Sequence, residues 1–83
     1  ESTNLLNVFK LQNNNFITIE GLATQSNETS LRLYNLLGNQ VLSTTLGTNI
    51  NTQTISTNGL ATGIYVIKLE SGNEVLTKKL IIQ

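Results

Sequence analysis

The stretch Asn58–Gln83, NGLATGIYVIKLESGNEVLTKKLIIQ, decides the fold. Within it, Ile64–Leu69 is almost wholly β-branched, aromatic or aliphatic, which is the composition that a pleated and largely buried strand selects. We therefore predict a central strand here, with both faces covered and Lys68 near the rim. Residues 71–73 form a predicted three-residue turn, in which Gly72 accepts the positive φ that tight hairpin loops require. The chain is thus expected to end in a β-hairpin.

The rest of the chain shows short apolar or alternating segments separated by turn signals about every 8 to 12 residues, as in β-sandwiches. Ile17 and Ile19 are expected to point inward, and a polar edge strand is expected to be anchored by Ile50 and Ile55. The polar segment Gly21–Ser30 is a predicted loop that crosses to a second sheet. The fold class is therefore all-β, a small seven-stranded antiparallel β-sandwich of immunoglobulin-like or Greek-key type. Its predicted strands are Leu5–Leu11, Phe16–Glu20, Leu31–Leu36, Gln40–Leu46, Ile50–Ser56, Ile64–Leu69 and a final strand running to Gln83.

Length and charge narrow the possible functions. The 83 residues predict one domain, 1–83, since a chain of this size buries only about 60–65% of its unfolded surface. Five basic and five acidic residues give a net charge of zero, and no basic cluster exceeds two residues, which argues against a nucleic-acid partner. The sequence holds no transmembrane segment and no signal peptide. It does not begin with Met, so we expect a segment of a longer precursor.

The residues needed for common catalytic and metal sites are missing. The sequence has no His, no Cys and no Asp, which removes the usual nucleophile–base pairs and metal-ligand sets. Glu70 and Glu74 flank the final turn, but a pair of solvated charges on a hairpin has little effect. We therefore predict that the chain is not an enzyme and binds no cofactor or metal.

Three segments carry a resemblance to a known family. They are Leu33–Val41 (LYNLLGNQV), Thr57–Tyr65 (TNGLATGIY) and Lys78–Ile82 (KKLII). In this order and spacing they resemble the type A C-terminal sorting domain of the type IX secretion system, found in secreted and cell-surface proteins of Bacteroidota. Members usually open with a Tyr-Pro-Asn-Pro-like turn, whereas this chain has no proline and offers Leu11–Asn15 there.

The resemblance implies a non-catalytic secretion signal at the C-terminus of a larger secreted protein. Such a domain follows an N-terminal cargo domain into the periplasm, folds, and docks on the type IX translocon of the outer membrane. A sortase-like surface protease then removes it, and the cargo is released or anchored at the cell surface. The implied partners are the translocon, the protease and the cargo of the same precursor.

Lys78 and Lys79 have two possible roles. Successive strand residues point to opposite faces, so the pair can simply keep a terminal strand soluble and unpaired, as lysines at sheet edges do. The resemblance instead favours recognition by the secretion apparatus. On that basis the predicted recognition residues are Gly63, Tyr65, Lys78, Lys79, Leu80, Ile81, Ile82 and Gln83, and the glycines assigned to structural turns are Gly38, Gly59 and Gly72.

Two other functions remain open from the residues alone. A carbohydrate-binding or fibronectin-like accessory module would need exposed aromatic faces, but the chain has no Trp, and its aromatic residues are Phe9, Phe16, Tyr34 and Tyr65. A structural spacer of an extracellular protein is compatible with the composition.

Overall fold

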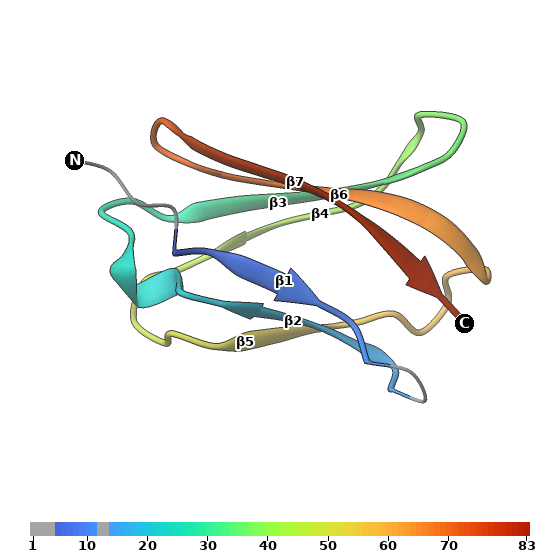
Figure 1. Ribbon diagram of the computed structural model, residues 1–83, viewed down its shortest axis with the longest axis horizontal. Helices are drawn as coiled ribbons and strands as arrows, with labels where there is room; N and C mark the ends of the chain where they lie inside the picture. The colour runs from blue at the N-terminus through green and yellow to red at the C-terminus, as the bar shows by residue number, and fades with distance from the viewer. Residues whose placement is uncertain (1–4, 12–13) are drawn as a thin grey trace.

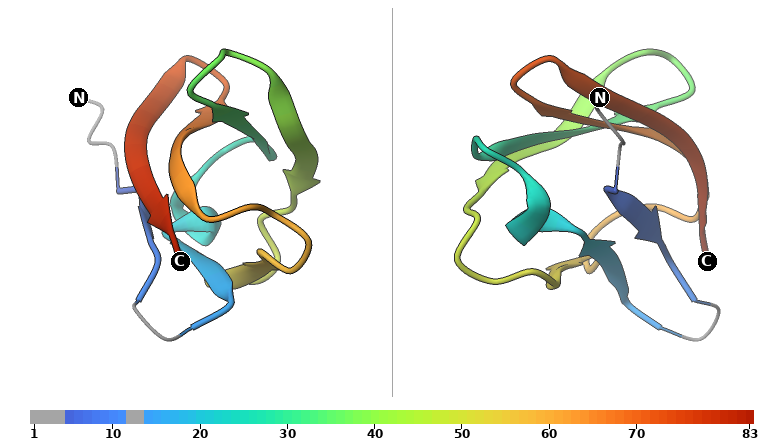
Figure 2. Two further views of the ribbon diagram at one scale, coloured as in Figure 1. Left: turned by 90° about the vertical axis from the view of Figure 1, so that its right-hand side faces the viewer. Right: turned by 60° about the vertical axis from the view of Figure 1, so that its left-hand side comes forward.

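The computed structural model describes residues 5–11 and 14–83. Seven strands form two antiparallel sheets that face each other, as Figures 1 and 2 show. The three-stranded sheet has the order β1 (Asn7–Phe9), β2 (Phe16–Glu20) and β5 (Gln53–Ser56). The four-stranded sheet has the order β4 (Gln40–Leu46), β3 (Thr29–Asn35), β6 (Gly63–Ser71) and β7 (Glu74–Ile82). The predicted seven-stranded antiparallel sandwich is confirmed.

The predicted central strand is β6, which lies between β3 and β7. Tyr65, Ile67 and Leu69 on its inner face are buried. The expectation that both faces are covered is wrong, since Ile64 on the outer face is 38% exposed. A two-layer sandwich leaves the outer face of each sheet in water. Lys68 accordingly lies on that outer face, opposite Arg32 of β3, and not at the rim.

Inward-facing residues of both sheets form one core, because side chains alternate between the two faces of a strand. Ile17 and Ile19 are fully buried, as predicted. Ile50 is 61% exposed and does not anchor the edge strand, because β5 begins only at Gln53, and Ile55 alone packs against the core. The buried apolar residues are Leu6, Val8, Ile17, Ile19, Leu22, Leu31, Leu33, Leu46, Tyr65, Ile67, Leu69, Leu80 and Ile82.

The predicted loop Gly21–Ser30 does carry the chain from β2 to β3 in the other sheet, but part of it belongs to the core. A single 3₁₀ turn, Leu22–Thr24, directs the Leu22 side chain inward, where it is fully buried. The backbone N–H of Leu22 bonds the carbonyl of Asn51, which ties this turn to the segment before β5.

Two tight turns close the hairpins. In the β6–β7 hairpin Ser71 pairs with Glu74, so the loop has two residues and not the three we predicted. Its first residue, Gly72, has a φ of 60°, as two-residue hairpin loops require. Gly38 and Gly59 also lie in turns, with φ values of 88° and 90°. In the predicted opening turn, Gln12 and Asn13 lie outside the described residues, as do the first four residues of the predicted domain.

Candidate functional site

The alternation along β7 divides the predicted recognition residues between the core and the surface. Leu80 and Ile82 are buried, with 5% and 2% exposure, and belong to the hydrophobic core. Ile81 is 58% exposed, and Lys79 and Gln83 are exposed as well. A partner that meets the folded domain therefore contacts only part of this predicted set.

The pairing of β6 with β7 brings the predicted recognition residues of β6 next to those at the end of β7. Gly63 pairs with Ile82, and Tyr65 pairs with Leu80. Tyr65 is 6% exposed, and its hydroxyl donates a hydrogen bond of 2.7 Å to the carbonyl of Ala61. Gly63 opens β6 on the surface with a φ of 152°. Tyr65 thus holds the segment before β6 in place, and of the two predicted recognition residues in β6 only Gly63 is accessible.

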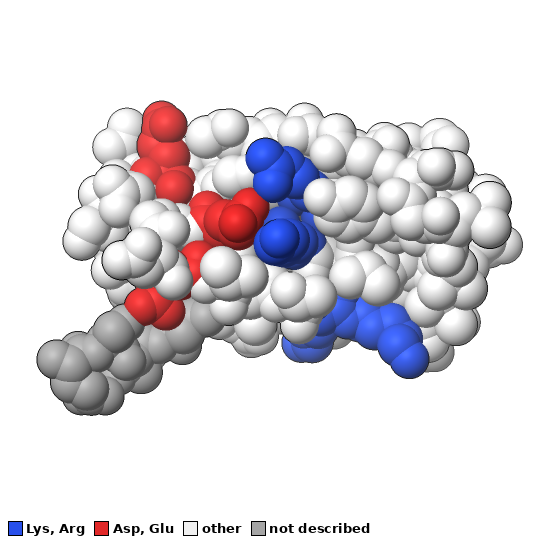
Figure 3. All heavy atoms as spheres, turned by 90° about the horizontal axis from the view of Figure 1, so that it is seen from above, with Lys and Arg blue, Asp and Glu red and all other residues white. Residues whose placement is uncertain are grey.

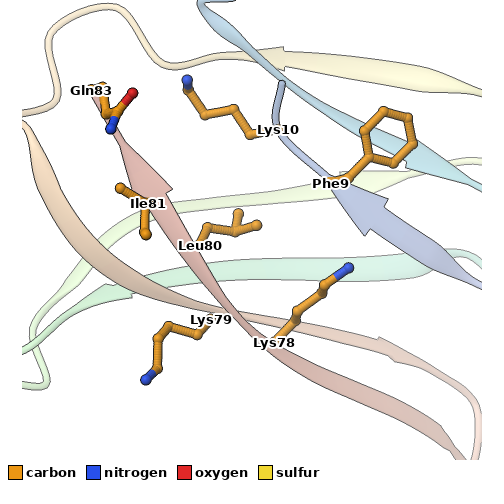
Figure 4. A pocket seen from close by; sticks show the side chains of 7 residues that line it. All are labelled: Phe9, Lys10, Lys78, Lys79, Leu80, Ile81 and Gln83. Carbon is orange, nitrogen blue, oxygen red and sulfur yellow. The ribbon is translucent and has the colours of Figure 1, made fainter. Parts of the chain in front are cut away.

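Lys78 and Lys79 point to opposite sides of β7, as predicted from strand geometry (Figure 4). Lys78 reaches toward the smaller sheet, where its Nζ donates a hydrogen bond of 2.8 Å to the carbonyl of Val8 in β1. Because β1 and β7 are edge strands of different sheets, this bond closes the side of the sandwich on which the two edges meet. Lys78 therefore has a structural partner.

An open groove lies between the end of β1 and the end of β7, which approach each other in both Figure 1 and Figure 2. Its volume is about 340 Å³. Figure 4 shows the side chains along its walls, which are those of Phe9, Lys10, Lys78, Lys79, Leu80, Ile81 and Gln83. Five of these residues belong to the predicted recognition set, whereas Phe9 and Lys10 were not predicted. Their only sequence signal was their place in the first strand.

Charge is unevenly distributed on the outer face of the larger sheet. Figure 3 shows acidic side chains at one end, basic ones in the middle, and a second basic group along the lower edge of the view, towards the other end. The central charges are paired: Arg32 Nη1 lies 2.9 Å from Glu70 Oε1, and Lys68 Nζ lies 3.9 Å from Glu70 Oε2. Within residues 5–11 and 14–83, Lys10, Lys78 and Lys79 form no ion pair. The groove is therefore basic.

Other kinds of site find little support in the part of the chain that the structure describes. It contains no group of three His, Cys, Asp or Glu residues placed to hold a metal ion, and none of its helices is long and apolar enough to cross a bilayer. The aromatic residues do not form a platform for sugar rings. Tyr65 is in the core, Phe9 of β1 is half-buried at the groove, and Tyr34 of β3 and Phe16 of β2 lie on the outer faces of different sheets.

Comparison with known proteins identifies the family. Residues 11–83 match the family described as the secretion system C-terminal sorting domain, which spans nearly the whole chain. The chain belongs to this family. It is a sorting domain of the type IX secretion system, which implies a cargo precursor, the type IX machinery, and export to the medium or the cell surface. Both the family and the immunoglobulin-like fold are of non-catalytic kinds.

The fold of this sorting domain is also found in a solved structure. A DUF3244 family protein from Bacteroides vulgatus, described as having an immunoglobulin-like β-sandwich fold, superposes with a TM-score of 0.78 at 16% sequence identity. The match covers 94% of this chain and 83% of the other. This likeness establishes the fold alone. No curated protein matches the sorting domain in sequence.

Proposed function

We propose that this domain is the C-terminal signal that directs a cargo protein across the outer membrane through the type IX translocon. The observation that carries the proposal is the family match over residues 11–83. As the C-terminal domain of a larger precursor, it passes through the periplasm, folds there and presents its last strand to the translocon. A surface protease then removes it, and the cargo is released or anchored.

The surface around the end of β7 supports this assignment. A transport apparatus that handles many cargos must recognise the signal and not the cargo, so the recognised feature has to be part of this domain. The exposed edge of a sheet suits that purpose, because its unpaired backbone groups can accept a strand from a partner. The accessible members of the recognition set are Gly63, Lys78, Lys79, Ile81 and Gln83, whereas Tyr65, Leu80 and Ile82 hold this edge in place from the core.

The experiment is a secretion assay. Residues 1–83 are fused behind a signal peptide and a fluorescent reporter, in a host with a working type IX system and in a translocon-deficient strain. We expect the reporter outside the first host and in the periplasm of the second. Retention of the reporter in both strains, with the domain folded, contradicts the proposal.

A pair of variants then separates recognition from folding. Lys79→Ala removes an exposed ammonium that has no partner among the described residues, so it is expected to reduce export without reducing the amount of folded fusion. Lys68→Ala removes a partly exposed lysine of the neighbouring strand, which pairs with Glu70, and serves as the control for loss of a surface charge outside the groove. Cleavage is followed by the size of the exported reporter, and anchoring by its partition between cells and medium.

A further inference from the structure

The edge of β7 that borders the groove has backbone groups without a strand partner in the described part of the chain. β7 is the last strand of its sheet. A two-residue hairpin closes with a hydrogen-bonded pair, here Ser71 and Glu74, and such pairs alternate with non-bonded ones along the ladder. The N–H and C=O groups of Lys79 and Ile81 therefore point away from β6. Both residues line the groove.

The groove combines positive charge with apolar surface. Lys10, Lys78 and Lys79 line it, with the ammonium groups of Lys78 and Lys79 on opposite sides of β7, and no acidic side chain is among its lining residues. Lys78 uses one of its three protons at the Val8 carbonyl, which leaves two for another acceptor. Ile81, which is 58% exposed, and the half-buried Phe9 supply apolar contacts between these charges. A ligand that fits must be both anionic and partly apolar.

We propose that this groove binds an extended acidic segment of a protein partner, which adds as a strand to the free edge of β7 and carries carboxylates on both of its faces, where they meet Lys10, Lys78 and Lys79. Strand addition pairs the backbone, and each face of the segment presents both carboxylates and apolar side chains, because Lys78 and Lys79 lie on opposite sides of β7. The inference rests on the proposed function in one respect: the partner is a component of the secretion machinery.

The geometry favours a polypeptide over the anionic surface of a membrane. Free backbone groups repeat along β7 at the spacing of a strand, and only another backbone matches such a row. The lysines also border a concave groove between two strand edges, as Figure 4 shows, whereas a lipid surface is best met by charges on a flat or convex face. A peptide is therefore the appropriate probe.

The test is a titration of isotope-labelled residues 1–83 with the synthetic nine-residue peptide Glu-Glu-Val-Val-Glu-Glu-Val-Val-Glu, which carries Glu and Val on both faces of an extended strand, followed by amide chemical shifts. We expect shifts at Phe9, Lys10, Lys79 and Ile81, with a Kd on the order of 0.1 mM. Raising the salt from about 50 to 500 mM should weaken binding roughly tenfold, because salt shortens the Debye length and screens the attraction between the carboxylates and the lysines. A peptide with Lys in place of Glu should not bind.

Matched variants isolate the two parts of the proposal. Lys79→Gln is expected to weaken peptide binding roughly threefold to tenfold, as loss of one charge at the rim of an interface does. Lys68→Gln, on the neighbouring strand, should leave it unchanged. Two peptides are made, each with N-methyl groups at alternate backbone positions, so that each lacks the N–H donors of one of its two edges. Only the peptide whose β7-facing edge lacks its donors should lose binding.

Three outcomes overturn the inference. They are the absence of shifts at these residues up to about 2 mM peptide, equal binding of both N-methylated peptides, and binding of phosphatidylglycerol vesicles through the same lysines without binding of the peptide. The secretion assay separates this inference from the proposed function. Export of the reporter without peptide binding supports the proposed function and contradicts the binding inference. Peptide binding without export supports the binding inference and contradicts the proposed function.

Discussion

The hydroxyl of Tyr65 donates a hydrogen bond of 2.7 Å to the carbonyl of Ala61, four residues earlier in the chain. The bond connects the segment that precedes β6 to the central strand itself. Tyr65→Phe keeps the buried ring and removes only the donor, so we expect a loss of about 1 kcal/mol in the free energy of unfolding, measured in urea. Tyr34→Phe is the matched control, because the structure shows no hydrogen bond of the Tyr34 hydroxyl within the described residues. Equal losses in the two variants would contradict the assigned role.

The two-layer core predicts that isoleucines differ sharply in importance. Ile67 is fully buried in the central strand, and Ile50 is 61% exposed before β5. We expect Ile67→Ala to lower the free energy of unfolding by about 3 kcal/mol, from lost burial and the cavity left behind, and Ile50→Ala by less than about 0.5 kcal/mol. Chemical denaturation of the two variants measures the difference. A comparable loss in both would restore Ile50 as an anchor.

The two adjacent lysines are expected to differ in stability measurements. Lys78→Ala removes the hydrogen bond to Val8, which links the two sheets, and should destabilise the domain by about 1 kcal/mol. Lys79→Ala, on the outer face, should change stability by less than about 0.5 kcal/mol. Thermal unfolding of both variants measures this difference. If Lys79→Ala were the more destabilising change, the division into a structural and an accessible lysine would be wrong.

Two glycines with nearly equal positive φ values provide a steric test. Gly21 and Gly38 have φ values of 89° and 88°. A Cβ at Gly38 meets no atom within 4 Å, whereas a Cβ at Gly21 would clash with the backbone carbonyl of Leu5. Gly38→Ala therefore carries only conformational strain, about 1 kcal/mol, and Gly21→Ala should lower the free energy of unfolding by about 3 kcal/mol. Equal losses in urea unfolding would show that the contact with Leu5 is not maintained.

Local sequence pattern was sufficient for most of the fold. Period-two alternation located Ile17 and Ile19 correctly, and turn glycines located the hairpins, because both signals lie within a few residues of each other. The pattern failed at Leu22, an apolar residue in a polar loop whose burial depends on contact with the segment before β5. It also fails at Ile50, because an apolar residue just before a strand has the same local pattern as one within the strand.

Only the β7 side of the candidate site could be predicted from the sequence. The lysines and the end of β7 were evident in the sequence and in its resemblance to the sorting family. The opposite wall was not, because Val8 and Lys78 are 70 residues apart and lie in different sheets. No periodicity within a strand reports which edges of two packed sheets meet. Phe9 and Lys10 become part of the site only through that packing.

The centre of the larger sheet is supplied late in the chain, since β6 is the sixth of seven strands and yet separates β3 from β7. Before β6 is made, β3 and β4 are an isolated hairpin, and hairpins of two strands are at best marginally stable in water. The inner face of β2, with Ile17 and Ile19, likewise awaits its opposing layer. A chain that ends before β6 therefore lacks the strand that joins β3 to β7, and the larger sheet cannot form. The strand order thus means that the larger sheet, and with it the edge of β7, becomes available only after nearly the whole chain has been synthesised.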